Sequence, residues 1–457
     1  MVMMEVTAIF DIGKTNKKFF LLDSSLKEVY REYIRFDETV DDDGYPCEDL
    51  NSLVAWMKNI YKQISNDPQY TVQSLNFSTY GASLVHVDSL GQPVAPFYNY
   101  LKPLPEEIKS KFLNKHGGQE SFELTTSSPF MGMLNSGLQL YYLKYFKPDL
   151  FARIKCSMHF PQYLSSLFSG ECVTDYTSLG CHTGLWDMAN NRYAKWVTDE
   201  KLEQLLCPIV PSDTHYIKDG VRIGVGIHDS SSALIPYYNA NQEPFTLIST
   251  GTWSICMNLY NNTGLTSSEL EADCLNFLNP KGLSVKASRL FLGKHLSNTA
   301  KLLSDHYGVD YQSYKSLKKP QDFTSKRVGS RQLMFDHSEI NPERFGFRNN
   351  AAPDFDQFEG YEDAMSQFFD EITDLQIASL KLAIGESEME NIYVDGGFSS
   401  SEIFIRFLAD KLPAYKVYSS SFPLGSALGA AVAVNHRNLP DGFLEKVYAV
   451  KLTPALV

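Results

Sequence analysis

The sequence predicts an α/β protein built from two domains. The chain has 457 residues, more than one ordinary hydrophobic core holds, so two domains are the default expectation. A turn rich in small and hydroxyl residues follows a β-prone stretch three times, at residues 11–16, 249–254 and 395–399. Backbone N–H groups in such turns can cradle phosphate oxygens, so three of them on one chain predict a nucleotide held between two lobes.

The composition is that of a globular protein, with 43% hydrophobic and 21% charged residues. The net charge of -13 argues against nucleic acid as a partner, because no excess of Lys or Arg is available to replace counterions. Seven scattered cysteines without a CxxC pair predict reduced thiols in a cytoplasmic protein, not disulfides or a zinc site. We expect no membrane span and no secretory leader, because the sequence has no run of about 18 apolar residues and no basic region followed by an apolar stretch.

The first half opens with a β-hairpin, because residues 6–10 and 18–22 are apolar and β-prone and flank the turn at 11–16. The same pattern returns at residues 245–259, which predicts a weak internal repeat. We expect the domain boundary near residues 237–243, with domains at 1–238 and 239–457. The other elements expected in the first half are a strand–turn–strand unit at 75–88, helices at 135–146 and 159–168, and a strand at 221–227 that leads into a helix.

The second half is expected to be mostly helical after its hairpin. Met365, Phe368, Phe369, Ile372 and Leu375 recur at helical spacing, which is typical of a helix packed on a core. A short strand is expected at 391–394, followed by helices at 400–412 and 424–434. Residues 307–360 are polar and weakly patterned, and no element can be assigned to them from the sequence.

Asp11 ends the first strand, and a carboxylate there can hold Mg²⁺ beside nucleotide phosphates, directly or through water. Gly13 permits close approach of the backbone. The alternative is an Asp that only stabilises a hairpin turn. A P-loop is excluded, because GxxxxGK[ST] needs glycine where this chain has Ala8. The residues of this turn that can donate to phosphate oxygens are Lys14, Thr15, Asn16 and Lys17.

The other two turns are weaker candidates. Thr250, Gly251 and Thr252 place a glycine between two hydroxyl groups, which can wrap phosphate oxygens but also suits an ordinary hairpin. Gly396 and Gly397 would let the backbone lie against a flat ligand such as adenine or ribose, and the alternative is a simple strand-to-helix turn.

Asp229 is the best catalytic candidate. The preceding strand delivers its carboxylate to the start of a helix, where it can accept the proton of a substrate hydroxyl that attacks a γ-phosphorus. The alternative is a helix N-cap. Asp229 also stands where GxGxxG would need its third glycine, which disfavours a dinucleotide fold. His228 is interpreted as a structural or substrate-contacting residue, because no partner lies at metal-ligand spacing. The acidic stretch 37–49 lacks EF-hand order and is interpreted as a solvated loop that ends in a helix cap.

Taken together, these segments resemble the FGGY family of carbohydrate kinases in their order and spacing. The resemblance covers residues 6 to about 435, with a poor fit at 307–390. It implies an α/β fold of two ribonuclease H-like domains, of the actin and hexokinase type, with an interdomain cleft where sugar and ATP meet. The matching segments are a first phosphate hairpin at 10–22, a threonine-rich stretch at 174–187, a catalytic segment at 224–233, a second hairpin at 248–257, an adenosine segment at 393–401 and a closing helix at 423–431.

Within that family, residues 228–230 and 251–254 are most similar to the kinases of L-rhamnulose and L-fuculose. The resemblance implies that Asp229 is the general base, that Asp11 serves Mg²⁺, and that the turn at Gly396 and Gly397 lies at the adenosine.

The sugar-contacting turn of those kinases is similar to residues 78–81. The residues expected to bind the sugar are Thr79, Tyr80, Gly81, His228 and Asp229. Ala82 and Ser83 replace the Val-Asp of those kinases, which removes a carboxylate from the sugar pocket. Residues 97–100, which end at Tyr100, lack the Trp/Tyr-x-Asp-x-Arg pattern of those kinases. Phe398 stands where many members of the family have a third glycine.

The expected function is therefore phosphorylation of a ketose, in particular a 6-deoxy-ketohexose such as L-rhamnulose or L-fuculose, with ATP and Mg²⁺ as cofactors. Two alternatives stay open. One is a kinase of another ketose or polyol, such as xylulose, ribulose or a glycerol-like substrate. The other is a non-catalytic sensor of sugar or nucleotide on the same scaffold, which the retained Asp11 and Asp229 disfavour. The expected partner is a small sugar, and a homodimer is left open.

Overall fold

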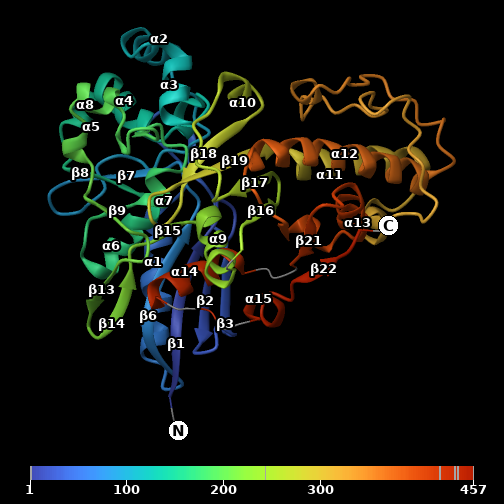
Figure 1. Cartoon of the computed structure of the whole chain (residues 1–457). Coiled ribbons are helices and arrows are strands. Elements are labelled where there is room, and N and C mark those ends of the chain that lie inside the picture. The colour runs from blue at the N-terminus through green and yellow to red at the C-terminus, as the bar shows by residue number, and fades with distance from the viewer. Residues whose placement is uncertain (1–2, 242, 421–423, 437–438, 440–441, 456–457) are drawn as a thin grey trace.

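Two seven-stranded β-sheets, one in each half of the chain, form the framework of the protein (Figure 1). The computed structural model describes residues 3–241, 243–420, 424–436, 439 and 442–455. The expected boundary segment 237–243 and the closing motif 423–431 therefore each include a residue outside the described part, Gln242 and Pro423. Among the described helices, none is long and apolar enough to cross a membrane.

The first sheet has the strand order β13–β14–β6–β1–β2–β3, and β15 pairs with β6 beyond β14. β1 and β2 form the predicted hairpin around residues 11–16. The bounds are β1 (Met4–Ile12), β2 (Lys17–Asp23), β3 (Glu28–Ile34), β6 (Tyr70–Thr79), β13 (His215–Lys218), β14 (Val221–Gly224) and β15 (Ile227–His228).

The second sheet has the order β18–β19–β17–β16–β20–β21–β22. β16 and β17 form the second predicted hairpin. The bounds are β16 (Phe245–Thr250), β17 (Ser254–Asn258), β18 (Cys274–Leu278), β19 (Ser284–Leu290), β20 (Asn391–Gly396), β21 (Lys416–Ser419) and β22 (Lys451–Thr453).

The expected internal repeat is confirmed by the way the strands pair. In each sheet the first strand pairs antiparallel with the next strand of the chain, and that strand pairs antiparallel with a third. On its other side the first strand pairs parallel with a later strand, β6 in the first sheet and β20 in the second. The carboxyl ends of these parallel strands lie at one edge of each sheet, the edge at which the predicted turns begin.

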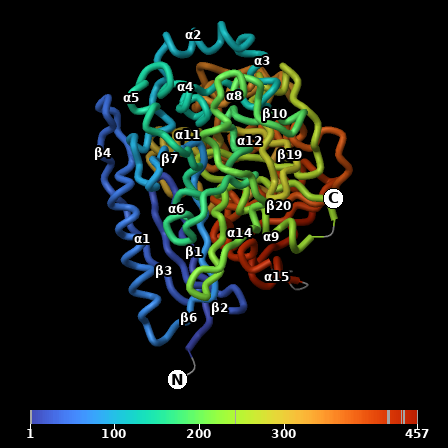
Figure 2. Tube along the Cα trace, turned by 90° about the vertical axis from the view of Figure 1, so that its left-hand side faces the viewer, coloured from blue at the N-terminus to red at the C-terminus, as the bar shows by residue number. Residues whose placement is uncertain are grey.

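Helices cover the sheets and separate the hydrophobic cores that lie against them. Helices α1 and α6 pack on the first sheet, and Figure 2 shows α1 along its outer side. Helices α11, α12 and α13 enclose the core of the second sheet, while α9 and α14 lie in a core that contains residues of both sheets. The bounds are α1 (Leu50–Ser65), α6 (Phe160–Ser169), α9 (Asp229–Ala240), α11 (Leu292–Tyr307), α12 (Tyr361–Ile384), α13 (Glu402–Lys411) and α14 (Gly425–Asn435).

An additional helical layer of the first lobe lies between its β6 and its last strands. It is held by its own aromatic core, which includes Tyr98, Phe112 and Tyr141. The helix expected at 135–146 lies here as α4. The bounds are β7 (Leu84–Val87), α2 (Glu106–Lys115), α3 (Gly118–Thr126), α4 (Gly137–Phe146), β8 (Cys156–His159) and α8 (Lys195–Asp199).

The stretch without predicted elements, residues 307–360, folds as loops with two short 3₁₀ turns, η3 (Tyr311–Ser316) and η4 (Pro342–Phe345). Its aromatic side chains pack on the core of the second sheet. His337 also joins it to the helices, because its imidazole lies 2.9 Å from both His295 on α11 and Glu371 on α12. Long-range packing therefore defines this segment, and no local pattern in its sequence could reveal that.

Two expected strand segments differ from the structure. The strand expected at 221–227 is divided into β14 and β15, because Gly226 adopts a φ of 86° and a side chain there would lie 2.5 Å from the Pro161 carbonyl oxygen. The two strands of the unit at 75–88, β6 and β7, belong to different sheets, and β7 pairs with β8.

The acidic loop behaves as expected at its end, where the Asp49 carboxylate caps α1 by accepting from two backbone N–H groups. Asp41, Asp42 and Asp43 are close enough to share a metal ion. Lysine ammonium groups occupy that position instead, since Lys102 lies 2.6 Å from carboxylates of both Asp41 and Asp43.

The crossing of α9 and α14 depends on one glycine. A Cβ atom at Gly429 would lie 1.8 Å from the Ser232 carbonyl oxygen, whereas a Cβ at Gly425 would meet nothing closer than 3.4 Å. We expect Gly429→Ala to lower the free energy of unfolding by about 1–3 kcal/mol, the usual cost of overpacking. Gly425→Ala in the same helix is the matched control and should change stability little. Urea unfolding of both variants measures this, and equal stabilities would contradict the assigned contact.

Candidate active site

The predicted chemical segments of the two lobes gather at the carboxyl-terminal edges of the parallel strands. In the first sheet, Asp11 of β1 pairs with Ser78 of β6, and Ser78 pairs with Ile227 of β15. In the second sheet, Thr250 of β16 pairs with Gly396 of β20. Ligands of open α/β sheets bind outside these strand ends, so the register alone brings the three turns and Asp229 to ligand-binding edges.

Asp229 is the first residue of α9, directly after β15. Its Oδ1 accepts a hydrogen bond from the Ser230 N–H at 2.6 Å and another from the Ser230 hydroxyl at 3.2 Å. Among the described residues none donates to Oδ2, and the relative solvent accessibility of the Asp229 side chain is 33%. One carboxylate oxygen is thus fixed, and the other is available to a molecule that enters from outside.

Burial raises the pKa of Asp229 to about 7, and the nearby negative charge of Asp11 acts in the same direction. The Ser230 hydrogen bonds and the charge of Lys18 oppose this shift without cancelling it. A carboxyl group with a pKa near neutrality can both accept and release a proton under ordinary conditions, which is what a general base requires.

Asp11 is held by one residue from each side. Its Oδ2 lies 3.2 Å from the Lys18 ammonium, and its Oδ1 accepts a hydrogen bond from the Ser426 hydroxyl of α14 at 3.0 Å. Lys18 faces Asp11 because the two residues are directly paired across the β1–β2 ladder. The carboxylate is thereby oriented at the edge of the sheet, close enough to Asp229 to raise its pKa.

The carboxylate oxygens of Asp11 and Asp229 are suitable ligands for a Mg²⁺ ion. Mg²⁺ favours one or two carboxylates plus waters and substrate phosphates. Asp11 and Asp229 bring two carboxyl groups close together, and Lys18 is the cation seen against them in the described part of the chain. Surplus negative charge of this kind suits a hard divalent cation, with Asp11 as the residue that would hold it.

The neutral imidazole of His228 lies beside Asp229. Burial lowers its pKa to about 4, so it carries no charge to neutralise Asp229, although its Nε2 lies 3.4 Å from that carboxylate. The same Nε2 lies 3.0 Å from the Cys181 sulfur. Gly81 lies against this pair, because a Cβ there would be 2.5 Å from the Cys181 sulfur. Gly81 is therefore required for packing behind the site.

The first turn is open toward the site. The Gly13 N–H donates to the Asn16 carbonyl at 3.0 Å and closes the turn. In the described structure, the N–H groups of Lys14 and Thr15 donate to no protein acceptor, as a phosphate cradle requires. The Asn16 side chain is held by Arg35 at 2.7 Å.

Lys17 is oriented differently from the expectation. Its ammonium is buried, lies 2.6 Å from Glu48 and donates to the Lys14 carbonyl at 2.9 Å. Successive residues of a strand face opposite sides, so Lys18, and not Lys17, points to the side of Asp11. Lys17 therefore supports the turn from behind, and the sequence reasoning overlooked Lys18 although strand alternation could have identified it.

Aromatic rings line the first-lobe side of the site. The rings of Tyr80 and Tyr100 are 5.9 Å apart, and the Lys14 ammonium lies 6.0 Å from both. The Tyr80 hydroxyl donates to Glu48 at 2.5 Å, which fixes its ring. The negative charge of Asp229 helps to raise the pKa of Tyr100, which shows that Tyr100 lies near that carboxylate. The hydroxyl of Thr79, by contrast, is buried and donates to the Tyr80 carbonyl at 2.9 Å.

The second turn is fixed by internal bonds. The Thr250 hydroxyl donates to the Asp395 carbonyl and accepts from the Phe398 N–H at 2.9 Å, so it joins two segments instead of facing outward. Gly396 has a φ of 82°, and a Cβ there would lie 1.9 Å from the Thr250 carbonyl oxygen. Gly251 and Thr252 remain exposed at the tip of the turn.

A cavity of about 400 Å³ lies beside this turn. Gly251 and Gly397, both predicted to contact a nucleotide, line it. The Thr252 carbonyl accepts from the N–H groups of Gly293 and Lys294, so the start of α11 forms part of the same wall. Phe398, at the position of the third glycine, lies at the cavity with its ring centroid 4.8 Å from that of Phe404. Ser400 and Ser401, from the expected adenosine segment, also line the cavity, and the lining residues that sequence reasoning missed are Gly293, Leu296, Ser297, Tyr314 and Lys315.

Residues 6–228 match the model of the FGGY family of carbohydrate kinases, N-terminal domain. A rhamnulokinase of Halalkalibacterium halodurans is 25% identical over 195 residues, which are 40% of this chain and 40% of that protein. A rhamnulokinase of Mannheimia succiniciproducens is 26% identical over 240 residues, 50% of this chain and 47% of the relative. The matched segments therefore span less than half the length of these curated relatives.

Solved structures resemble the chain over nearly its whole length. A carbohydrate kinase from Novosphingobium aromaticivorans has a TM-score of 0.77 at 21% identity, covering 98% of this chain and 96% of that one. A ligand-bound xylulose kinase from Lactobacillus acidophilus has a TM-score of 0.77 at 15% identity, with 99% and 94% covered. At these identities the likeness concerns the fold, and it confirms the predicted two-domain architecture of the actin and hexokinase type.

The pKa of Asp229 can be measured directly. In the ligand-free protein we expect its carboxyl carbon to titrate near pH 7, because burial and Asp11 both disfavour the ionised form. Asp11→Asn should lower this pKa by removing the like charge, and Asp305→Asn, on the exposed face of α11, should leave it unchanged. Carbon-detected NMR of aspartate-labelled protein, assigned with Asp229→Asn, gives the titration. An ordinary pKa near 4 would contradict the described electrostatics.

Proposed function

We propose that the chain is a carbohydrate kinase of the FGGY family, whose N-terminal-domain model matches residues 6–228, and that it transfers the γ-phosphoryl group of ATP to a hydroxyl group of a ketose sugar. The observation that carries the proposal is the position of Asp229, a partly exposed carboxylate with a raised pKa beside Asp11 and the open first turn. A sugar kinase requires a general base, hydrogen-bond donors to the phosphate oxygens and a cation site close together. The carboxyl-terminal edge of the first sheet supplies candidates for each.

In the proposed mechanism, Asp229 accepts the proton of the attacking hydroxyl through Oδ2 while Ser230 holds Oδ1. The ionised carboxylate is the active form, so its fraction rises as the pH passes 7. Lys18 and the N–H groups of the first turn bind phosphate oxygens on the first-lobe side, and the turn at Gly251 and Thr252 does so on the other. Mg²⁺, when bound near Asp11, neutralises phosphate charge.

The sugar is proposed to be a 6-deoxy-ketohexose, such as L-rhamnulose or L-fuculose. Two relatives named rhamnulokinase support this choice. The aromatic pair Tyr80 and Tyr100 supports it as well, because a C6 methyl group and the C–H face of a sugar pack favourably against rings. The nucleotide would occupy the cavity beside Gly397, with adenosine toward α11 and its phosphates toward the cleft.

A panel of sugars tests the function. ADP release from ATP and Mg²⁺ would be followed by a coupled assay with L-rhamnulose, L-fuculose, D-xylulose, D-ribulose and glycerol. We expect the highest kcat/KM with a 6-deoxy-ketohexose. A preference for xylulose, ribulose or glycerol would overturn the proposed sugar while keeping the kinase. Silence with every sugar despite ATP binding would favour the non-catalytic sensor.

The role of Asp229 is tested by Asp229→Asn. General-base catalysis contributes about 10²–10⁴-fold, so we expect kcat to fall by that order while the affinity for ADP persists. In the wild type, kcat/KM for the sugar should rise with pH through about 7. Asp149→Asn, an exposed aspartate of the first lobe, is the matched control. Near-normal turnover by Asp229→Asn would refute the assignment.

Lys18 and Lys17 should behave differently when each is changed to Met. Lys18→Met should fold normally and lose roughly 10²-fold or more in kcat, because it removes a cation beside the transferring group. Lys17→Met should leave the buried Glu48 carboxylate without its cationic partner, which costs about 3–5 kcal/mol of stability. Steady-state kinetics and urea unfolding of both variants separate the roles, and equal loss of kcat with unchanged stability in both would contradict them.

A further inference from the structure

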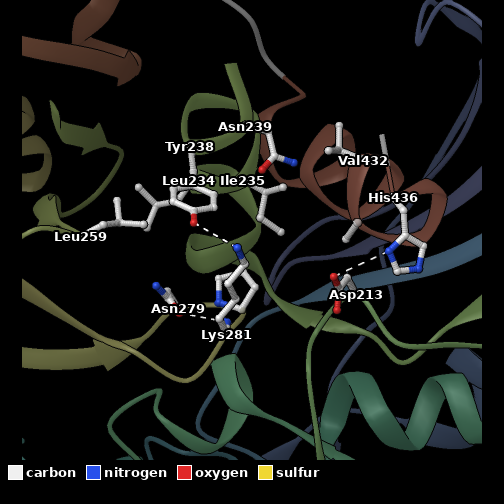
Figure 3. A pocket seen from close by; sticks show the side chains of 12 residues that line it. Asp213, Leu234, Ile235, Tyr238, Asn239, Leu259, Asn279, Lys281, Val432 and His436 are labelled. Atoms are coloured by element: carbon white, nitrogen blue, oxygen red, sulfur yellow. Dashed lines mark hydrogen bonds and ion pairs between the residues drawn. The ribbon is translucent and has the colours of Figure 1, made fainter. Parts of the chain in front are cut away.

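A second cavity, of about 210 Å³, lies at the ends of α9 and α14 remote from Asp229. Figure 3 shows it enclosed between these helices, a loop of the first lobe that carries Asp213 and the β18–β19 connection that carries Lys281. It shares no lining residue with the cavity beside Gly397. Its volume is below the range of about 300–1,000 Å³ typical of drug-sized ligands, so a small metabolite is the appropriate size of occupant.

The walls of this cavity, which we call the hinge cavity because they come from both halves of the chain, are chemically divided. Five aliphatic side chains supply its apolar surface, which are Leu234, Ile235, Leu259, Val432 and Ala433. On one side the Lys281 ammonium donates to the Tyr238 hydroxyl at 3.3 Å. Among the described residues no carboxylate lies within ion-pair distance of this ammonium. On the other side the Asp213 carboxylate lies 3.7 Å from the His436 imidazole (Figure 3).

This distribution indicates the chemistry of the ligand. The aliphatic wall favours an apolar body. Lys281, which has no carboxylate partner among the described residues, favours a negative head group, because a charge-assisted hydrogen bond is the strongest kind that the cavity offers. A cationic ligand would meet Lys281 and find Asp213 already engaged. A small carboxylate with a branched aliphatic body satisfies both walls.

A chain of hydrogen bonds joins the rim of the cavity to the catalytic segment. The N–H of Ser212, next to Asp213, donates to the Pro280 carbonyl at 3.1 Å and so ties the two rim loops together. The Ser212 hydroxyl donates to the buried Asp175 carboxylate, which also accepts from the Thr177 hydroxyl. That Thr177 oxygen accepts from the His228 N–H at 3.1 Å, one residue before Asp229.

We propose that the hinge cavity is an effector site for a small aliphatic monocarboxylate, and that its occupancy changes the reactivity of the Asp229 segment. The kinetic part rests on the proposed kinase function. The walls come from both halves of the chain, so a change in the angle between the lobes changes the shape of the cavity. A ligand that binds one arrangement better than the other shifts the population of that arrangement.

Binding is tested with three matched probes, which are 4-methylpentanoate, its neutral amide 4-methylpentanamide, and the cation 3-methylbutylamine. The readout is the methyl NMR signal of Ile235 in isotope-labelled protein, which does not depend on catalysis. We expect saturable shifts with the carboxylate, and roughly tenfold weaker binding of the amide, because hydrogen bonds to charged groups are the stronger ones. No shift with any probe, or equal affinity for carboxylate and amide, would overturn the proposed site.

Two lysine variants test whether Lys281 binds the carboxylate head group. Lys281→Met should weaken 4-methylpentanoate roughly tenfold without altering the fold, because this lysine is at the surface. Lys58→Met, which removes an exposed lysine of α1, should bind as the wild type does. Retained binding in Lys281→Met would overturn the assignment of the head group.

Kinetics test the coupling. With the best sugar, 4-methylpentanoate should change kcat or the KM of the sugar in the wild type and in Lys58→Met, but not in Lys281→Met. Binding to Ile235 without any kinetic change would overturn the effector role. A wild type that is inactive with all sugars would defeat the proposed kinase instead, and the NMR result would still decide whether the cavity binds carboxylates.

Discussion

The close crossing of α9 and α14 is the constraint on which the site depends. Because Gly429 has no side chain, the two helices approach until the Ser232 hydroxyl can donate to the Ser426 carbonyl at 2.7 Å. Ser426 in turn donates its own hydroxyl to Asp11, and α9 begins at Asp229. One helix pair therefore sets the position of both acidic groups, and it does so from the core that contains residues of both sheets.

The electrostatics of the site follow from that placement. Two carboxyl groups held near each other cannot both ionise at no cost, so the one with poorer compensation acquires the higher pKa. Asp11 has Lys18 and the Ser426 hydroxyl, whereas Asp229 has the Ser230 N–H and a neutral histidine beside it. Asp11 is thereby oriented where it suits a metal ion, and Asp229, whose pKa burial raises to about 7, is the group that can accept a proton near neutrality.

The features that local sequence chemistry determines were predictable. Glycine-containing turns between β-prone arms gave both hairpins, and the strand before Gly396 with the helix after it followed from pattern alone. The features that the sequence did not predict depend on contacts between residues that are far apart in the chain. The break at Gly226 reflects a contact with Pro161, which is remote in sequence, and Tyr314 and Lys315 reach the cavity beside Gly397 from a segment whose order comes from tertiary packing. Lys18 is a different case, because strand alternation from Asp11 already distinguished it from Lys17.

The most direct measurement is a crystal structure of the protein with its sugar, Mg²⁺ and a non-hydrolysable ATP analogue. The account predicts that Asp229 Oδ2 lies within about 2.6–3.2 Å of one sugar hydroxyl, with that oxygen in line with the γ-phosphorus. It also predicts the adenosine in the cavity beside Gly397. A complex in which a different side chain contacts the reacting hydroxyl, with Asp229 still bound only to Ser230, would contradict the central claim.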